Sequence, residues 1–413
     1  MRAVCRSFLS SGAGFGSRLQ AAYSMAALGT RCQNLYRLRV AKQDHSRWPI
    51  EPHTLAKHAI LRRYLGRWFP IMAKRNARII YVDGFAGPGR YVEGEDGSPI
   101  IALRIARDFL ASGVLRPQQL TAIFVEQKTG RHRLLSEEVR ALNVADPAYS
   151  GITCFVEKSD YASTMARIWS ILDAGKAHIA PTFALIDPTG IKGVRYHDTA
   201  KLLSYPKTEV LVNLMYEETN RFRGGPEFEP HLDRFFGHQD WRVLRDIENS
   251  GERRRRTVEI FRDRLLEAGA KYVLSFEMKN ASNATDYFLF FATKSATGLA
   301  AMKWAMWQVD KSGQFSFSDY TYAKGPMLVQ PSPDYDALRR QLAQHFGGRR
   351  SVPMEEIELY VLAETSFYYY KREALKPMED QGLLSIDTSQ YPLRKKGTFP
   401  DRISVDFATE VRA

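Results

Sequence analysis

The sequence predicts a mostly parallel α/β sheet with helices on both faces, of the Rossmann-like kind, followed by a smaller C-terminal domain. Three observations lead to this prediction. Short apolar segments alternate with amphipathic ones from about residue 79 to residue 215, a glycine-rich turn follows the first apolar segment, and the pattern changes after a proline-rich stretch at 326–333. Alternating strands and helices favour a parallel sheet, because each parallel connection needs a crossover.

The elements of the first domain can be placed in chain order. Before the glycine turn, Leu55, Leu61 and Trp68 recur near helical spacing and predict a helix within 48–73. After it, the pattern predicts strands at 79–82, 120–125, 152–156, 182–186 and 209–215, and helices at 100–110, 131–142, 161–172 and 253–268. The segment 222–249 is less regular. Two later strands, 272–278 and 287–292, are expected to form an antiparallel edge.

The pattern changes beyond the linker that Pro326, Pro331 and Pro333 predict. We expect helices at 336–346, 354–365 and 367–381, a strand at 383–386, a basic turn at 391–400 and a returning strand at 403–407. This order is typical of a winged helix-turn-helix. The predicted domains are therefore 44–330 and 335–413.

The first 43 residues carry seven basic residues and no acidic one. They fit either a disordered or non-native extension or a mitochondrial transit peptide, and we leave them out of the fold. The chain has a net charge of +13, so the remainder carries 13 − 7 = +6. A long chain with that charge is only mildly basic, which makes overall charge weak evidence for nucleic acid binding.

The three cysteines, Cys5, Cys32 and Cys154, have no CxxC spacing, so neither a zinc site nor a disulfide framework is indicated. The histidines form no metal pair, and no metal site is expected. A reducing, cytoplasmic compartment fits this cysteine usage. No stretch reaches the roughly 18 uninterrupted apolar residues of a membrane span, so we expect no membrane partner.

A nucleotide-cofactor site is predicted at the turn from residue 83 to 89. An acid and three glycines follow a strand, and glycine allows both a sharp turn and the close approach of a ligand. The dinucleotide fingerprint does not fit, because it needs glycine at Val92. A tight turn without a ligand is the alternative. The candidate cofactor contacts here are Asp83, Gly84, Phe85, Gly87 and Gly89.

Acids at three further strand ends extend this prediction. Glu126 follows the second strand, where an acid typically binds ribose hydroxyls, although an ordinary exposed glutamate is the alternative. Asp160 follows the third strand and is expected either to accept from an adenine amino group or to cap the next helix. Asp187 and Pro188 end the fourth strand and are the candidate catalytic residues, placed to orient or deprotonate an acceptor; a helix-capping aspartate is the alternative.

The C-terminal domain offers a candidate nucleic acid contact. Its twelve basic and eleven acidic residues from 337 to 413 give a net charge of only +1, which leaves DNA contact and protein contact equally open. The candidate contacts lie on the third helix and in the basic turn: Lys371, Arg372, Lys376, Arg394, Lys395 and Lys396.

Several motifs together resemble the three-Cys-motif partner proteins, TcmP, over about residue 48 to the C-terminus. The motifs are His53-Thr54-Leu55-Ala56-Lys57, the run from Tyr81 to Gly89, Gly97-Ser98-Pro99, Phe124-Val125-Glu126, Asp187-Pro188-Thr189-Gly190 and Met302-Lys303…Trp307. The resemblance implies a class I methyltransferase-like fold, S-adenosyl-L-methionine as cofactor, a bacterial or phage context and a partner protein with a three-cysteine motif. One departure is Thr189, where enzymes that methylate exocyclic base amines have a second proline.

Two hypotheses about function remain open. In the first, the chain is a methyltransferase that acts on nucleic acid or on a partner protein. In the second, it is a non-catalytic module whose α/β domain is a scaffold or ligand sensor and whose C-terminal domain binds DNA or protein. The methyl acceptor and the oligomeric state are not indicated by the sequence.

Overall fold

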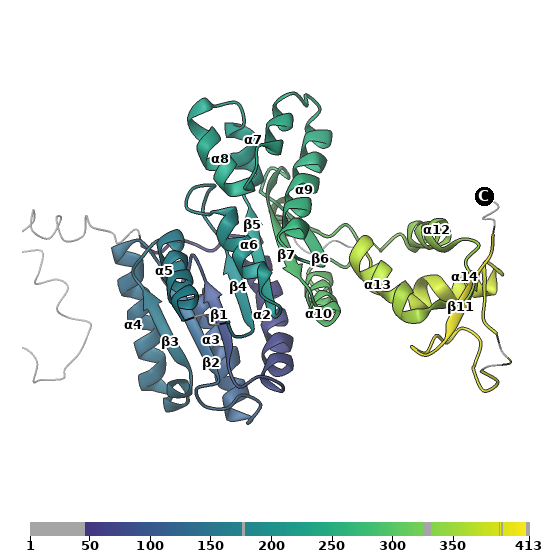
Figure 1. The fold of residues 1–413 in the computed structure, drawn as a ribbon, viewed down its shortest axis with the longest axis horizontal. Coiled ribbons are helices and arrows are strands. Elements are labelled where there is room, and N and C mark those ends of the chain that lie inside the picture. Colours follow the sequence, from purple (N-terminus) through teal and green to yellow (C-terminus); the bar gives the residue numbers. More distant parts are fainter. Residues whose placement is uncertain (1–45, 176–177, 325–331, 388, 390, 410–413) are drawn as a thin grey trace, which may run out of the picture. The chain divides into compact units, whose positions relative to one another are not determined.

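The computed structural model describes residues 46–175, 178–324, 332–387, 389 and 391–409 (Figure 1). The predicted extension 1–43 and most of the predicted linker lie outside these residues. The described residues divide into eleven strands and thirteen α-helices. None of these helices combines the length and apolar character that a membrane crossing needs.

An eight-stranded sheet has the order β3-β2-β1-β4-β5-β7-β6-β8. The five strands from β3 to β5 are parallel, β7 is antiparallel to both of its neighbours, and β8 runs parallel to β6. The fold is therefore the predicted Rossmann-like, class I methyltransferase-like sheet with an antiparallel edge. The strands are β1 (Ile79–Asp83), β2 (Leu120–Val125), β3 (Thr153–Glu157), β4 (Thr182–Ile186), β5 (Thr208–Leu214), β6 (Tyr272–Lys279), β7 (Thr285–Thr293) and β8 (Ser316–Ser318).

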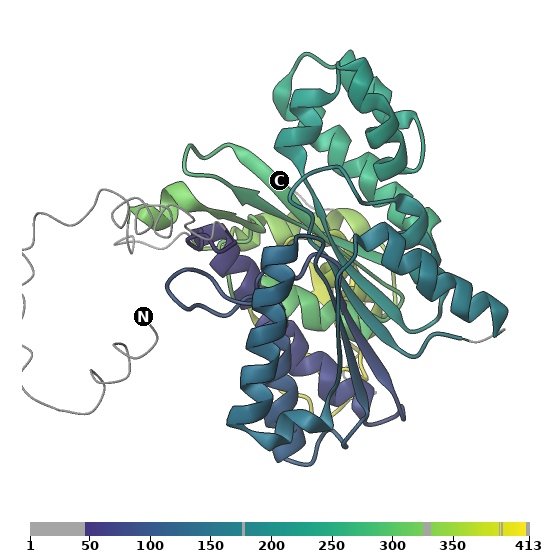
Figure 2. The ribbon, with the colours of Figure 1, turned by 90° about the vertical axis from the view of Figure 1, so that its left-hand side faces the viewer.

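Helices cover both faces of this sheet (Figure 2). One face packs against α2 (Pro52–Ala73), α3 (Ser98–Ala111), α4 (Thr129–Ala145) and α10 (Ala296–Trp307). The other packs against α5 (Tyr161–Ala174), α6 (Tyr196–Ser204), α8 (Glu229–Phe236) and α9 (Ser250–Glu267). Two short helices, α7 (Tyr216–Phe222) and α11 (Asp319–Ala323), follow β5 and β8.

Burial on both faces explains why the central strands are continuous apolar runs. In β4, Phe183 and Leu185 lie in the core beneath α2, whereas Ala184 and Ile186 lie in the core beneath α5 and α6. Alternate residues of a strand point to opposite faces, so a strand that is covered twice has no solvent-facing set. The sequence pattern therefore located these strands to within one or two residues.

The C-terminal segment contains α12 (Tyr335–Phe346), β9 (Val352–Pro353), α13 (Met354–Glu364), α14 (Lys376–Asp380), β10 (Leu384–Ser385) and β11 (Ser404–Phe407). Its three strands form an antiparallel sheet in the order β10-β11-β9. The strand β9 was not predicted. Assignment to the winged helix class, and the domain boundaries 44–330 and 335–413, stay predictions.

The expected helix 367–381 is wrong at its start. Residues 367–370 are not helical, a π-helical turn covers Lys371–Leu375, and only then does α14 begin. The amides of Ala374 and Leu375 both donate to the carbonyl of Tyr370, at 2.9 Å each. Pro377 explains the wider turn, because in a regular α-helix its ring would clash with the carbonyl of Glu373.

Lys303 joins α10 to the end of α13. The side chain is fully buried, and its ammonium donates to the carbonyls of Val361, Leu362 and Thr365 at 2.6, 2.9 and 2.5 Å. These carbonyls lie at the end of a helix, where backbone donors run out, so the three N–H groups supply hydrogen bonds there. The carbonyl of Val361 also accepts from the hydroxyl of Thr365 at 2.7 Å. Burial lowers the pKa of Lys303, and the charge of Glu364 opposes that shift.

We predict that Lys303→Met lowers the free energy of unfolding by about 3 kcal/mol, because three buried carbonyls lose their donor. Lys294→Met is the matched control, since Lys294 donates to the carbonyls of Leu203 and Tyr205 but remains partly exposed. Its expected cost is about 1 kcal/mol or less. Urea unfolding measures both, and equal losses would contradict the role assigned to Lys303.

Candidate active site

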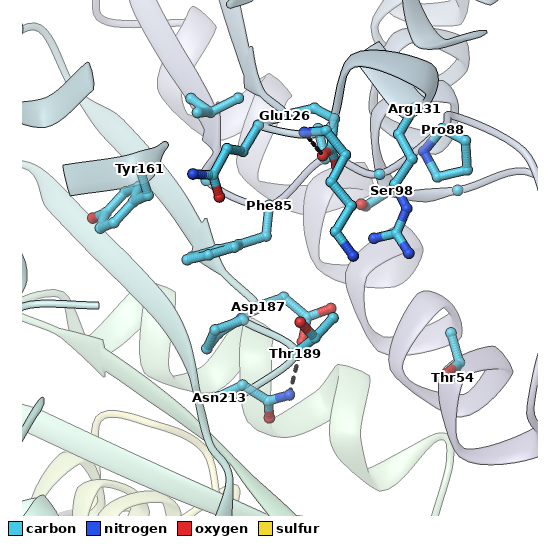
Figure 3. A pocket seen from close by; sticks show the side chains of 18 of the residues that line it. Thr54, Phe85, Pro88, Ser98, Glu126, Arg131, Tyr161, Asp187, Thr189 and Asn213 are labelled. Atoms are coloured by element: carbon cyan, nitrogen blue, oxygen red, sulfur yellow. Dashed lines mark hydrogen bonds between the residues drawn. The ribbon is translucent and has the colours of Figure 1, made fainter. Parts of the chain in front are cut away.

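A cavity of about 390 Å³ lies at the carboxyl ends of the parallel strands. Residues that follow β1, β2, β3 and β4 line it, together with the first turns of α2 and parts of β5 and β7 (Figure 3). The structure therefore brings together nearly all the candidate cofactor and catalytic residues of the sequence. Those that line the cavity are Gly84, Phe85, Gly87, Gly89, Glu126, Asp160, Asp187 and Pro188.

The glycine turn owes its shape to specific backbone requirements. Gly87 and Gly89 have φ values of 65° and 85°, in the left-handed region that L side chains rarely adopt. Gly97 approaches this turn closely: its amide donates to the carbonyl of Gly89 at 2.8 Å, and a Cβ on Gly97 would lie 2.8 Å from the same oxygen. The Gly-Ser-Pro motif is therefore part of the turn.

Asp83 lies beneath the turn rather than at the cavity, which differs from the predicted cofactor contact. Its side chain is fully buried, and its carboxylate accepts from the amide of Phe85 at 3.3 Å. Burial raises the pKa of Asp83 to about 7, a shift that hydrogen bonds from Ser98 and Phe85 oppose and the charge of Asp187 reinforces. Asp83 therefore shapes the glycine turn from within.

Glu126 and two aromatic rings form one end of the cavity. The Glu126 side chain is buried, and its Oε1 accepts from the amide of Lys128 at 2.6 Å. The ring of Phe85 lies 5.6 Å from that of Tyr161, at an angle of 34°. Gly84 allows this packing, since a Cβ there would lie 2.6 Å from a ring carbon of Tyr161. This end presents a carboxylate beside a flat apolar surface.

Asp160 caps α5, as one of its two predicted interpretations expected. Its carboxylate accepts from the amide of Ser163 at 2.8 Å, which lowers the pKa of Asp160 against the opposing effect of burial. Asp160 also lines the cavity. One carboxylate oxygen of Asp160 thus accepts from α5. The predicted contact with an adenine amino group would use the other oxygen.

Asp187 is held from two sides at the other end of the cavity (Figure 3). One carboxylate oxygen forms an ion pair with Lys57 of α2, and the other accepts from the side-chain amide of Asn213 of β5 at 2.7 Å. Partners on two different elements fix both the position and the rotamer of the carboxylate. Asp187 is therefore a rigid acceptor whose exposed fraction is 22%.

Sequence reasoning gave no role to several residues that line this cavity. Lys57 and His53 stood in a motif that carried only a resemblance, and Tyr287 was the first residue of a predicted strand. Asn213 offered a usable signal, since it is a polar residue inside the apolar run Val210-Leu211-Val212-Asn213-Leu214. Trp48 and Arg131 also face the cavity, with the guanidinium 4.3 Å above the indole ring.

Acids neutralise much of the candidate nucleic acid surface. Arg394 is buried and binds both carboxylate oxygens of Glu379 at 2.8 Å. Three further candidates form ion pairs with acids: Lys371 with Asp401, and both Lys376 and Lys396 with Asp380. Nucleic acid contact by the six residues stays a prediction. The pairing of Arg394 with Glu379 gives Arg394 a structural role that does not depend on such contact.

The four arginines Arg253–Arg256 near the start of α9 are not uniformly exposed. Arg253 is buried and donates to the side chain of Asn220 at 2.7 Å and to the carbonyl of Glu248 at 3.1 Å. It therefore anchors the start of α9 to the preceding loop.

No family model and no curated protein matches the sequence of this chain. Solved structures similar to it include Trm1 from Pyrococcus horikoshii in complex with S-adenosyl-L-methionine, with 11% identity over 88% of this chain and 93% of that one and a TM-score of 0.33. A Legionella pneumophila protein of the family model DUF519 has 11% identity over 61% and 88%, with a TM-score of 0.34. Precorrin-6y C5,15-methyltransferase from Geobacter metallireducens has 7% identity over 56% and 87%, with a TM-score of 0.27.

Scores and identities this low carry no argument about activity, ligand or partner. The description of the fold therefore depends on the strand order and the directions of the strands. Membership of the three-Cys-motif partner family gains no support from these similarities and stays a prediction.

The buried Asp83 predicts a pH-dependent stability. The pKa of Asp83 is raised from an ordinary value of 3.8 to about 7 in the folded chain. The stabilisation that comes from binding its proton in the folded state is therefore fully present below about pH 4 and is lost as the pH rises through about 7. We expect wild type to lose stability relative to Asp83→Asn between pH 5 and pH 8, with a slope of at most about 1.4 kcal/mol per pH unit. Urea unfolding at both pH values measures this. If the difference in free energy of unfolding between wild type and Asp83→Asn does not change with pH, the role assigned to Asp83 is contradicted.

Proposed function

We propose that this chain is an S-adenosyl-L-methionine-dependent methyltransferase of the three-Cys-motif partner type, acting on nucleic acid or on a partner protein. The observation that supports the proposal is that residues after four consecutive parallel strands line one cavity. Ligands of open α/β sheets bind at this edge, where the strand order reverses. In this chain the reversal lies between β1 and β4.

The residues of the cavity fit a nucleoside that carries an amino acid tail. Glu126 has one carboxylate oxygen beyond the hydrogen bond to Lys128, which suits a ribose hydroxyl. The ring of Phe85 offers an apolar face to a base, and the glycine turn leaves room for close backbone contact, since a Cβ on Gly87 would have only a ring carbon of Trp48 within 4 Å. The volume of about 390 Å³ lies within the range of small-ligand sites.

Asp187 is the residue best placed to orient an acceptor. The cofactor would supply an already activated methyl group, so the protein's contribution is mainly position and charge. Lys57 and Asn213 hold the Asp187 carboxylate at the end of the cavity opposite Glu126 (Figure 3). We infer that Asp187 aligns the acceptor, and that Pro188 restricts the backbone that follows it.

One observation favours the non-catalytic alternative. Both oxygens of Asp187 already have partners inside the chain, which is also what a purely structural carboxylate would show. In that case the cavity would bind the cofactor as a regulatory ligand. Methyl transfer from labelled cofactor separates the two, because the alternative expects binding without any transfer.

We predict that Glu126→Gln weakens binding of S-adenosylhomocysteine about tenfold, because the amide replaces a charge-assisted hydrogen bond to the ribose while keeping an oxygen for the amide of Lys128. Isothermal titration calorimetry measures the dissociation constants.

Glu157→Gln is the matched control for Glu126→Gln. Glu157 ends the neighbouring strand β3, pairs with the exposed Arg167 and is not among the residues that line the cavity. The affinity of the Glu157→Gln variant for S-adenosylhomocysteine should equal that of wild type. Wild-type protein that shows no heat of binding would contradict the cofactor assignment altogether.

A further inference from the structure

Carboxylates gather at the end of the cavity where Asp187 lies. Glu51, Asp187 and Asp286 line this end, and Asp319 lies directly behind it. They come from four separate elements: the residue before α2, the end of β4, the second residue of β7 and the first residue of α11. We call these four residues the acidic wall.

Only a few positive groups face the acidic wall. His53 has Asp319 Oδ2 at 2.7 Å from Nδ1, and Glu51 Oε2 at 3.1 Å and Asp286 Oδ2 at 4.0 Å from Nε2. Lys57 pairs with Asp187. Four carboxylates thus share one lysine and one histidine. Negative charge in excess of its local partners is what an added cation would neutralise.

His58 does not add to the positive charge of this end. It is buried, and burial together with the charges of Lys57 and Arg62 lowers its pKa to about 3, so it is neutral at physiological pH. Three other cations that line the cavity have partners of their own: Arg90 pairs with Asp96 and Glu138, Arg131 stacks on Trp48 and Lys192 lies over the ring of Phe228. Lys128 also lines the cavity, and its backbone amide donates to Glu126.

Three buried polar atoms of the cavity lining lack a hydrogen-bond partner within the described part of the chain. The hydroxyl of Tyr161 belongs to the end that holds Glu126. The other two, the hydroxyl of Tyr287 and Oδ1 of Asn213, belong to the end that holds Asp187, and each residue is 3% exposed. A buried polar atom without a partner costs about 1–3 kcal/mol, so a pair at one end of a cavity points to a ligand that supplies their bonds.

The hydrogen-bonding chemistry of the Asn213 oxygen and the Tyr287 hydroxyl limits the kinds of ligand that can bind here. The Asn213 oxygen only accepts, and the Tyr287 hydroxyl can accept or donate; burial and the charges of Asp187 and Asp286 raise its pKa well above its usual value, so it stays protonated. An ammonium group offers three donors and no acceptor. It satisfies these oxygens and the acidic wall at the same time.

A phosphodiester fits this end poorly. Each nucleotide brings a negative charge and acceptor oxygens, and nucleic acid sites normally meet it with lysines and arginines. Here it would meet four carboxylates, with Lys57 already committed to Asp187.

We propose, resting on the proposed methyl transfer, that the acceptor is a primary amine of a protein, such as a lysine side chain, that enters as an ammonium against the acidic wall. The amine loses one proton to Asp286, whose side chain is 25% exposed and releases that proton to water. The nitrogen lone pair then forms the bond to the cofactor's methyl carbon, and the electron pair of the broken carbon–sulfur bond stays on sulfur.

The experiment measures binding to protein saturated with S-adenosylhomocysteine. The probes are a blocked peptide with a single central lysine among glycines, the same peptide with acetyl-lysine, and a single-stranded RNA oligonucleotide. We expect the lysine peptide to bind, and the acetylated peptide and the RNA to bind at least about tenfold more weakly. Tighter binding of RNA, or equal binding of the two peptides, would overturn the proposal.

Variants locate the binding on the acidic wall. Asp286→Asn and Glu51→Gln should each weaken the lysine peptide about tenfold while leaving affinity for S-adenosylhomocysteine unchanged. Asp263→Asn, which alters an exposed carboxylate of α9, is the matched control and should change neither. Unchanged peptide affinity in both wall variants overturns the proposal. Loss of S-adenosylhomocysteine binding by wild type is a separate result that contradicts the proposed function.

Discussion

The chain passes outward from β1 to β2 and β3, and then returns to the other side of β1 as β4. This reversal directs successive connections to opposite faces of the sheet and leaves a crevice between the turns that follow β1 and β4. The glycine turn lies on one side of the crevice and Asp187 on the other. The positions of the candidate cofactor and catalytic residues depend on that single change of direction. Each of them lies in or next to a turn, and the change of direction determines where the strand before that turn lies.

The sequence located this framework because burial on both faces leaves a clear trace. The strands β1, β2 and β4 are almost wholly apolar, and an acid ends or directly follows each of them. Contacts between elements distant in the chain leave no such trace. Lys57 meets Asp187 only because α2 packs over the sheet. The capping bond from Ser163 to Asp160, by contrast, is local and was one of the two interpretations that the sequence allowed. The third C-terminal helix was predicted to start too early, because residues 367–370 are not helical and a π-helical turn precedes α14.

Charge is distributed along the crevice rather than balanced at each point. At the end that holds Glu126, Arg90 pairs with Asp96 and Glu138, and Arg131 stacks on Trp48. At the other end the carboxylates outnumber their partners, and His53 is shared among three of them. Such an arrangement favours a cation within the crevice, and low exposure strengthens the preference because water screens buried charges less.

The same end also carries polar atoms that the fold leaves unsatisfied. Asn213 uses its amide to hold Asp187 but leaves Oδ1 without a partner among the described residues, and the hydroxyl of Tyr287 is in the same condition. A chain selected for stability alone would pair or remove these groups, since each costs free energy when buried. Their retention beside a rigid carboxylate is typical of a site whose energetic cost is offset when a ligand binds. Rigidity matters here because methyl transfer depends on placing two reacting atoms in line, and small displacements of the acceptor reduce the rate steeply.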